Sequence, residues 1–365
     1  MSARVELLSR IHSADDLDAA VEYCYARRWT DGLPVIPATR APVERTLAYL
    51  GRDPQEVIGV IPPRNGIATV EKIVINSVMA GCRPEYVPVV IAAVQAMLEE
   101  RFNLNGVQTT THNCAPLVVV SGPLVTALGF NTKEGALGHG SRADAAIGRA
   151  VRLVLWNIGG GYPGEPCKTT HGHPGYYSFC VAEDAEANPW EPLHVERGFA
   201  PEDSVVTVTA TEAPHSVGTG SGDRPADDVL AVLADSIAVL GNCVPMGGGN
   251  VVMVLGPMTA ANLAQSGRSK MDVKRDIARL AQRTVRDMKR RRVSFEPSHP
   301  LHWSHLTNAD DDDALVPFLR SPDDLVILTT GGWGSPGGIS SVCPGWGGFG
   351  GFTVSKRIEI PQGKS

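Results

Sequence analysis

The chain has 365 residues and a formal net charge of −6 at pH 7, with 43% hydrophobic and 20% charged residues. These values are typical of a globular protein of about two domains, and the negative charge argues against a protein that binds nucleic acid. We expect no secretory leader and no membrane span, because no apolar run reaches the ~18 residues that a span needs. Seven cysteines without paired spacing predict reduced thiols and a cytoplasmic location.

In chain order, apolar residues recur at helical spacing in several segments and form short strands in others. The helices that this pattern predicts cover residues 12–28, 42–50, 69–80, 84–100, 143–156, 227–240, 259–266 and 272–290. The predicted strands cover residues 57–61, 117–120, 176–182, 204–210, 250–255, 325–329 and 352–360. Helices that alternate with short apolar strands indicate an α/β fold with a mostly parallel sheet.

One pattern occurs twice. An apolar run ends in Gly-Pro at residues 118–123 and again at 251–257, and a helix rich in alanine and arginine follows each copy. Upstream of each copy, an apolar helix closes on glycine and cysteine, at 70–82 and at 229–243. We therefore predict two similar α/β units that arose by internal duplication, with a functional cleft between them.

The domain organisation follows from this repeat. We expect a helical and extended N-terminal segment at 1–60, a first α/β unit with a long irregular insertion at 61–200, and a second α/β unit with a C-terminal glycine-rich loop at 201–365. Duplicated α/β units with exposed strand edges often associate, so we expect a homo- or hetero-oligomer.

Residues 331–352 form a glycine-rich segment that contains Cys343 and Trp346. Backbone amides in such a segment can approach a ligand closely. The alternative is a flexible linker, but the aromatic residues of the segment argue against it. We predict a functional loop in which Cys343 is the nucleophile and Trp346 contacts the substrate.

A candidate anion site lies before the predicted helix 143–156. Free backbone amides, the Ser141 hydroxyl and the Arg142 guanidinium could bind a carboxylate or phosphate there, with Gly140 allowing close approach. Ordinary capping of the helix by Ser141 is an equally good interpretation.

His112 and Cys114 alternate just before a predicted strand, so their side chains point to the same face. A histidine beside a cysteine can lower the pKa of the thiol and create a nucleophile. Together with Cys167, His171 and His173, these residues also have a spacing that suits zinc, although a paired Cys-x-x-Cys is missing. A buried thiol beside a loop histidine is the third interpretation.

Cys82 and Cys243 end the two matching apolar helices, so we consider that both face the predicted cleft. Burial in the core is the simpler interpretation of each cysteine taken alone. Glu71 is near Cys82 in the sequence and offers an acid/base partner. Arg64 and Arg149 are candidates for holding an anionic substrate.

Four segments resemble a known family when they are taken together. They are Pro-Arg-Asn-Gly-Ile-Ala-Thr-Val-Glu-Lys at 63–72, Met-Ala-Gly-Cys-Arg-Pro-Glu-Tyr at 79–86, Ile-Gly-Arg-Ala at 147–150 and Pro-Trp-Glu-Pro-Leu-His-Val-Glu-Arg-Gly-Phe at 189–199. From Trp29 onward the chain resembles an uncharacterised bacterial family that accompanies small proteins with a selenocysteine- or cysteine-containing Ser-Cys motif (UGSC-type). The resemblance implies a partner subunit that supplies a reactive thiol or selenol. It assigns no catalytic residues, and this chain lacks the Gly-Ser-Cys motif itself.

These features favour a cytosolic enzyme or enzyme subunit that uses a reactive cysteine for reductive or eliminative cleavage of a small anionic substrate. The predicted catalytic residues are Cys343, Cys114, His112, Cys82 and Glu71. The predicted substrate-binding residues are Arg64, Arg149, Gly140, Ser141, Arg142 and Trp346. One alternative is a zinc-dependent hydrolase or lyase, whose ligands would be His112, Cys114, Cys167, His171 and His173. Another is a non-catalytic subunit that binds a small ligand.

Overall fold

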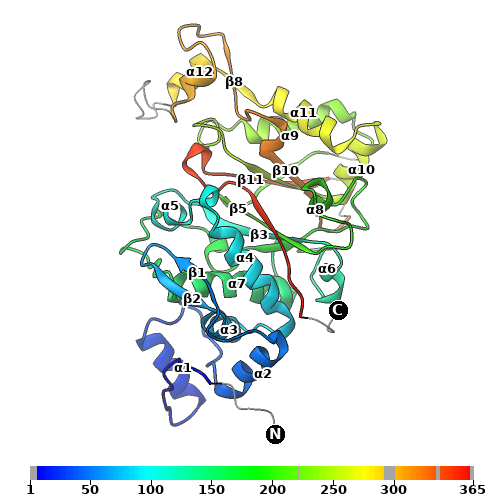
Figure 1. Cartoon of the computed structure of the whole chain (residues 1–365). Helices are drawn as coiled ribbons and strands as arrows, with labels where there is room; N and C mark the ends of the chain where they lie inside the picture. Colours follow the sequence, from blue (N-terminus) through cyan, green and yellow to red (C-terminus); the bar gives the residue numbers. More distant parts are fainter. Residues whose placement is uncertain (1–5, 221, 292–300, 334–337, 362–365) are drawn as a thin grey trace.

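The computed structural model describes residues 6–220, 222–291, 301–333 and 338–361. It combines helices with two four-stranded sheets and two small two-stranded sheets, so the α/β class is confirmed (Figure 1). The helices are α1 (Leu17–Ala26), α2 (Arg40–Leu50), α3 (Val70–Met79), α4 (Val87–Met97), α5 (Leu104–Thr109), α6 (Leu124–Ala127), α7 (Arg142–Asn157), α8 (Leu193–Glu196), α9 (Ala226–Ile237), α10 (Pro257–Gln265), α11 (Lys270–Leu280) and α12 (Val285–Arg290).

The strands of the two larger sheets come from both halves of the chain. The first sheet has the order β12-β5-β3-β4, and the second has the order β10-β7-β11-β6. The strands are β1 (Val57–Ile61), β2 (Gly66–Thr69), β3 (Ala115–Ser121), β4 (Cys180–Ala182), β5 (Val205–Thr211), β6 (His215–Gly218), β7 (Val251–Leu255), β8 (Gln282–Thr284), β9 (Leu315–Pro317), β10 (Leu325–Thr329), β11 (Ile339–Pro344) and β12 (Val354–Arg357).

Each larger sheet is mixed. In the first, β3 pairs parallel with β4 and antiparallel with β5, which pairs antiparallel with β12. In the second, β7 pairs parallel with β10 and antiparallel with β11, which pairs antiparallel with β6. Antiparallel pairs therefore outnumber parallel ones, and the prediction of a mostly parallel sheet is not confirmed.

The two sheets pack against each other, and helices cover the outer face of each. Leu117 and Val119 of β3 point into the layer between the sheets, where they join Val252 and Val254 of β7. The alternate residues of β3, such as Val118, pack against the helices of the first half. The alternate residues of β7 pack against α9, α10 and α11 in the same way. The resulting order of layers is helix, sheet, sheet, helix (Figure 1).

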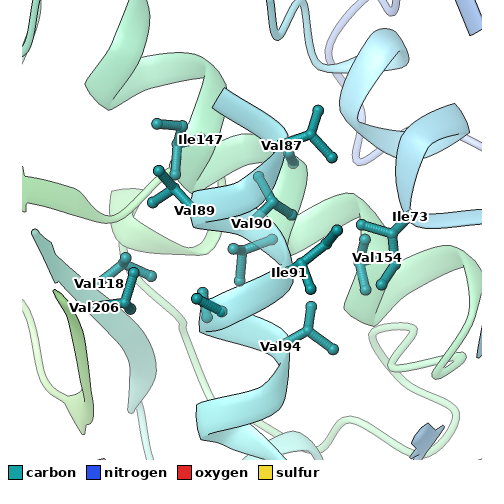
Figure 2. Packing of buried hydrophobic residues seen from close by; sticks show 14 of the residues in the cluster. Ile73, Val87, Val89, Val90, Ile91, Val94, Val118, Ile147, Val154 and Val206 are labelled. Atoms are coloured by element: carbon teal, nitrogen blue, oxygen red, sulfur yellow. The ribbon is translucent and has the colours of Figure 1, made fainter. Parts of the chain in front are cut away.

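Helix α4 lies at the centre of the first helical layer. Its sequence is almost entirely apolar, and nearly all of its side chains are buried. Figure 2 shows Val90 and Ile91 of α4 between Ile73 of α3, Val154 of α7 and Val118 of β3. Truncation of such a side chain to alanine is expected to cost about 2–5 kcal/mol of stability.

Polar caps fix where several helices begin. The Ser141 side chain accepts hydrogen bonds from the amides of Ala143 and Asp144 at the start of α7. The helix predicted at 12–28 begins only at Leu17, because Asp16 caps it. The helix predicted at 272–290 is wrong as one element, since α11 ends at Leu280 and is followed by β8 and α12.

The chain crosses between the two sheets twice. Strand β5 of the first sheet leads through residues 212–214 into β6 of the second, and β11 of the second sheet leads back into β12 of the first. The two crossings meet where Thr211 pairs with Gly345 and the Glu212 amide donates to the Pro344 carbonyl. Residues at the end of β5 therefore lie at the junction of the two sheets.

Candidate functional site

Two strand ends at this junction carry titratable side chains. Cys114 directly precedes β3, and Glu212 directly follows β5. Because these strands are antiparallel neighbours that pair Ala115 with Thr211, Cys114 and Glu212 lie at the same edge of the first sheet.

His112 connects these residues. Its Nε2 lies 2.8 Å from Oε1 of Glu212, and the ring lies close enough to the thiols of Cys114 and Cys243 to interact with both, although its buried Nδ1 has no hydrogen-bond partner among the described residues. Burial alone would lower the pKa of His112, but the interactions with the two thiols and with Glu212 outweigh burial and raise this pKa to about 11. At neutral pH the ring is therefore an imidazolium that lies between one carboxylate and two thiols.

The second unit contributes Cys243, from the loop between α9 and β7. Its side chain is partly exposed, and the guanidinium Nη2 of Arg291 lies 3.8 Å from its sulfur. The same nitrogen donates to the Gly241 carbonyl at 3.4 Å. Burial lowers the pKa of Arg291, although an arginine guanidinium keeps its charge in proteins. Cys243 thus lies beside a positive charge, a setting that stabilises thiolates and attracts anions.

Cys114 differs from Cys243 in its surroundings. Only 1% of its surface is exposed, and burial raises the pKa of its thiol even though His112 opposes that shift. Cys114 is therefore a neutral thiol at rest, while Cys243 is the more accessible of the two sulfurs. This contrast would suit a pair in which Cys243 attacks the substrate first and Cys114 resolves the resulting mixed disulfide.

The irregular segment after α7 folds over the loop that carries His112. The Asn113 side-chain oxygen accepts hydrogen bonds from the amide of His171, and the Tyr176 hydroxyl donates to the Cys114 carbonyl at 2.8 Å. His173 lies near enough for the charges of Glu212 and His112 to act on it, and burial lowers its pKa. The segment closes one side of the cluster.

The predicted zinc ligands are not arranged around one point. Cys167 is buried near Arg152, and the Nδ1 atom of His173 accepts a bond from the Gly175 amide. Among the residues that the structure describes, no three His, Cys, Asp or Glu side chains are placed to hold a metal ion. The geometry gives the zinc alternative no support.

Cys343 does not lie in a loop. Residues 339–344 of the glycine-rich segment form β11, which pairs with both β7 and β6, and Cys343 stands opposite Val252. Its side chain is completely buried between the sheets, and burial raises the pKa of its thiol to about 12. The prediction of a functional loop is wrong for residues 339–344. The burial of Cys343 argues against its predicted role as nucleophile.

Cys82 and Glu71 lie in the first helical layer. The Cys82 thiol donates to the Ala146 carbonyl at 3.3 Å, and burial raises its pKa. The predicted match between Cys82 and Cys243 does not hold in space. Cys243 follows α9, which covers β11 and β6. The helix in the corresponding place, over β5 and β12, is α4 and not α3, which Cys82 follows. Glu71 accepts hydrogen bonds from the amides of Leu8 and Ser9, so it anchors the N-terminal segment.

The two predicted substrate arginines have protein partners. Arg149 forms an ion pair with Asp31 at 2.9 Å and donates to the carbonyls of Leu33 and Pro34. Arg64 pairs with Glu165 and lies over the Tyr162 ring. Both arginines hold loops of the first half in place.

The other predicted binding residues also serve local structure. Ser141 caps α7, and the Arg142 guanidinium donates to the Gly81 carbonyl at 2.8 and 3.0 Å. Gly140 has a positive φ of 110°, which the turn before α7 requires. Trp346 stacks on Phe349 and packs against the hydrophobic core between the first sheet and its helices.

Glu212 and Arg291 are the site residues that the sequence analysis missed. Glu212 follows a strand of alternating valine and threonine, and only the pairing of that strand with β3 brings it to His112. Arg291 belongs to a basic run at a helix end, a pattern typical of solvated surface. The local sequence signals neither role.

Comparison with known protein families and with curated proteins finds no match for this chain. Within the described ranges, no helix is long and apolar enough to cross a membrane.

Proposed function

We propose that this protein is a thiol-dependent enzyme, or the thiol-bearing subunit of one, that reductively cleaves a small anionic substrate. The observation that carries the proposal is one imidazole, His112, which is bonded to the Glu212 carboxylate and lies beside the thiols of Cys114 and Cys243. A thiol, a base and a group that orients the base form the arrangement of cysteine-based catalysts.

Cys243 is the attacking residue in this proposal. It is the more exposed of the two thiols, and the positive charge of the Arg291 guanidinium beside it draws an anionic substrate toward the sulfur. This role replaces the one expected of Cys343, which is buried between the sheets.

The second thiol favours reductive over eliminative cleavage. The Cys243 thiolate attacks one sulfur of a substrate disulfide, the S–S bond breaks, and the departing thiolate takes a proton from His112. His112 then removes the proton of Cys114, whose sulfur attacks the mixed disulfide at Cys243. The products are two free thiols from the substrate and one Cys114–Cys243 disulfide. An external thiol must reduce this disulfide, and the thiol or selenol partner implied by the family resemblance would have the required chemistry.

The environment of the cysteines fits a reducing compartment. All seven are free, as a dithiol that must be regenerated requires. A cytoplasmic location is therefore part of the proposal.

We also infer that the two units are related by duplication. The inference is supported by the shared pattern of the sheets, in which one parallel pair is followed by two antiparallel pairs. It makes β3, β4 and β5 the counterparts of β7, β10 and β11, with α4 and α7 matching α9 and α11. The edge strands β6 and β12 are then exchanged between the units. This arrangement accounts for a site built from both halves.

Single-turnover reaction with 5,5′-dithiobis(2-nitrobenzoate), a small anionic disulfide, tests the mechanism. The wild type should release both thionitrobenzoate groups in a fast phase, because Cys114 displaces the second. Cys114→Ser should release one group and keep the other on Cys243, and Cys243→Ser should lose the fast phase. Cys24→Ala, a buried cysteine of α1, is the matched control. A fast phase that survives in Cys243→Ser would overturn the proposal.

A further inference from the structure

A second candidate site lies at the opposite side of the first helical layer. An open pocket of about 980 Å³ separates the N-terminal segment and α1 from α2 and α3. Figure 1 shows α1 and α2 at one end of the molecule, beside α3. The volume of the pocket is at the upper end of the range of about 300–1,000 Å³ typical of small-molecule sites. None of its lining residues belongs to the thiol cluster.

The walls of this pocket are apolar and aromatic. His12, Tyr23 and Trp29 all line it, and their ring centroids lie 5.1 to 5.7 Å apart in tilted and edge-to-face contacts. Ile75 and Met79 of α3 supply the aliphatic side. Such walls favour a ligand with an extended apolar part.

The charged residues of the lining are mainly cationic. Arg10, Arg40 and Lys72 line the pocket, and Asp16 is the carboxylate among the lining residues that the structure describes. Asp16 is engaged as the cap of α1, and Arg40 is shared with Glu44, which does not line the pocket. Arg40 is also the first residue of α2, whose N-terminal dipole adds positive potential. The Lys72 ammonium donates to the Ile67 carbonyl at 2.8 Å, a neutral partner that leaves its charge uncompensated among the described residues, so the charged lining is net positive and favours an anionic head group.

Hydrogen bonds hold the walls in place without a ligand. Glu71 fixes the amides of Leu8 and Ser9, so the N-terminal segment is fastened to α3. On the inner side, Asn157 donates to the Asn76 side chain at 2.7 Å. A pocket formed in advance requires little ordering on binding, which favours affinity.

We propose that this pocket binds an amphipathic organic anion, with its apolar part against Trp29, Tyr23 and α3 and its acidic head at Arg40 and Lys72. The proposal does not depend on the thiol chemistry, because the two sites share no residue.

Isothermal titration of the full chain with dodecanoate, below its micelle concentration, tests the proposal. Saturable binding at one site per chain is expected. The double variant Arg40→Gln/Lys72→Gln should weaken it about tenfold or more, since both positive partners of the head group are removed. Ala20→Phe, which places a ring in the pocket, should block it. Arg45→Gln, an exposed arginine of the same helix outside the pocket, is the matched control and should bind as the wild type.

Thermal melting of each variant shows that it is folded before binding is compared. Absence of saturable dodecanoate binding to the folded wild type would overturn the proposal. Equal binding of dodecyltrimethylammonium would overturn the anionic head group, and unchanged binding by Ala20→Phe would overturn this location. The reaction of Cys243 with the anionic disulfide should be the same in all these variants, so failure of one site does not imply failure of the other.

Discussion

The His112 ring and the Glu212 carboxylate lie 2.8 Å apart although 100 positions of sequence separate them. The contact arises because β3 and β5 run antiparallel with Ala115 opposite Thr211, so that the residues just outside both strands meet. With Nε2 bonded to Glu212, the buried Nδ1 has no hydrogen-bond partner among the described residues and is the ring nitrogen that remains for the thiols. In the proposed mechanism Glu212 is thus a positioning residue that acts through His112.

Replacement of Glu212 tests this role. Glu212→Gln removes the negative charge that helps to raise the pKa of His112, so that pKa should fall. The rate at which iodoacetamide alkylates Cys243 can be followed by mass spectrometry as a function of pH. In Glu212→Gln the part of this pH profile that depends on His112 should move to lower pH, and the rate at neutral pH should be about 10²-fold lower. Glu186→Gln, an exposed carboxylate, should leave the profile unchanged. An unaltered profile in Glu212→Gln would contradict the positioning role.

The raised pKa of His112 also predicts how stability changes with pH. A histidine with a folded pKa of about 11 and an ordinary value of 6.5 stabilises the fold fully below pH 6.5. This contribution is lost as pH rises toward 11. The stability advantage of the wild type over His112→Gln, from urea unfolding, should therefore shrink steadily between pH 7 and pH 10. An advantage that grows over this range would show that the ring is neutral in the fold.

The mixed sheets show why the sequence pattern led to the prediction of a mostly parallel sheet. Continuous apolar strands usually belong to parallel sheets, because helices cover both of their faces. Here β3 and β7 are buried on both faces for another reason, since helices cover one face and the second sheet covers the other. A residue pattern records burial and not the direction of the neighbouring strand, so the class was predictable and the pairing was not.

The site was predictable where its residues are close in the chain. His112 and Cys114 alternate before a strand, and that pattern alone indicated a common face. Cys243 comes close to the same ring, with Arg291 beside its sulfur, only because the two sheets meet at Thr211 and Gly345. Conversely, the glycines around Cys343 hid a short strand, β11, which pairs with β6 along one edge and with β7 along the other.

Substitution of Cys343 separates a structural from a catalytic role. Its side chain is fully buried between the sheets, so Cys343→Ser places a hydroxyl in apolar surroundings and should cost about 1–3 kcal/mol of unfolding free energy. The fast reaction of the folded protein with the anionic disulfide should keep its wild-type rate. Loss of that phase in a folded Cys343→Ser variant would restore Cys343 as the nucleophile.

Arg149 should matter for stability more than for catalysis. Its guanidinium faces Asp31, whose side chain is only 2% exposed, and also holds the carbonyls of Leu33 and Pro34. Arg149→Met leaves a buried carboxylate without its partner and should cost about 3–5 kcal/mol by urea unfolding. Arg275→Met, an exposed arginine of α11, should cost less than about 0.5 kcal/mol. A folded Arg149→Met protein with normal stability but poor reaction with the anionic disulfide would instead indicate substrate binding.

Glu71 controls the N-terminal segment, and its effect should depend on pH. Burial would raise the pKa of Glu71, but hydrogen bonds from Ser9, Leu8 and Gln55 outweigh it and lower the pKa below its ordinary value of 4.5. The stabilisation is therefore present above about pH 4.5 and is lost as pH falls through the lowered pKa. Glu71→Gln should reproduce the acid state at neutral pH, because the neutral amide accepts these bonds more weakly.

Hydrogen exchange followed by mass spectrometry measures this directly. In Glu71→Gln the amides of Leu8 and Ser9 should exchange at least tenfold faster, while those of α4 keep wild-type protection, because the loss of one charge-assisted acceptor costs about 1.5–3 kcal/mol locally. Dodecanoate should bind this variant more weakly, since the segment forms one wall of the pocket. Faster exchange throughout α3 and α4 would show that Glu71 supports the whole helical layer and not the segment alone.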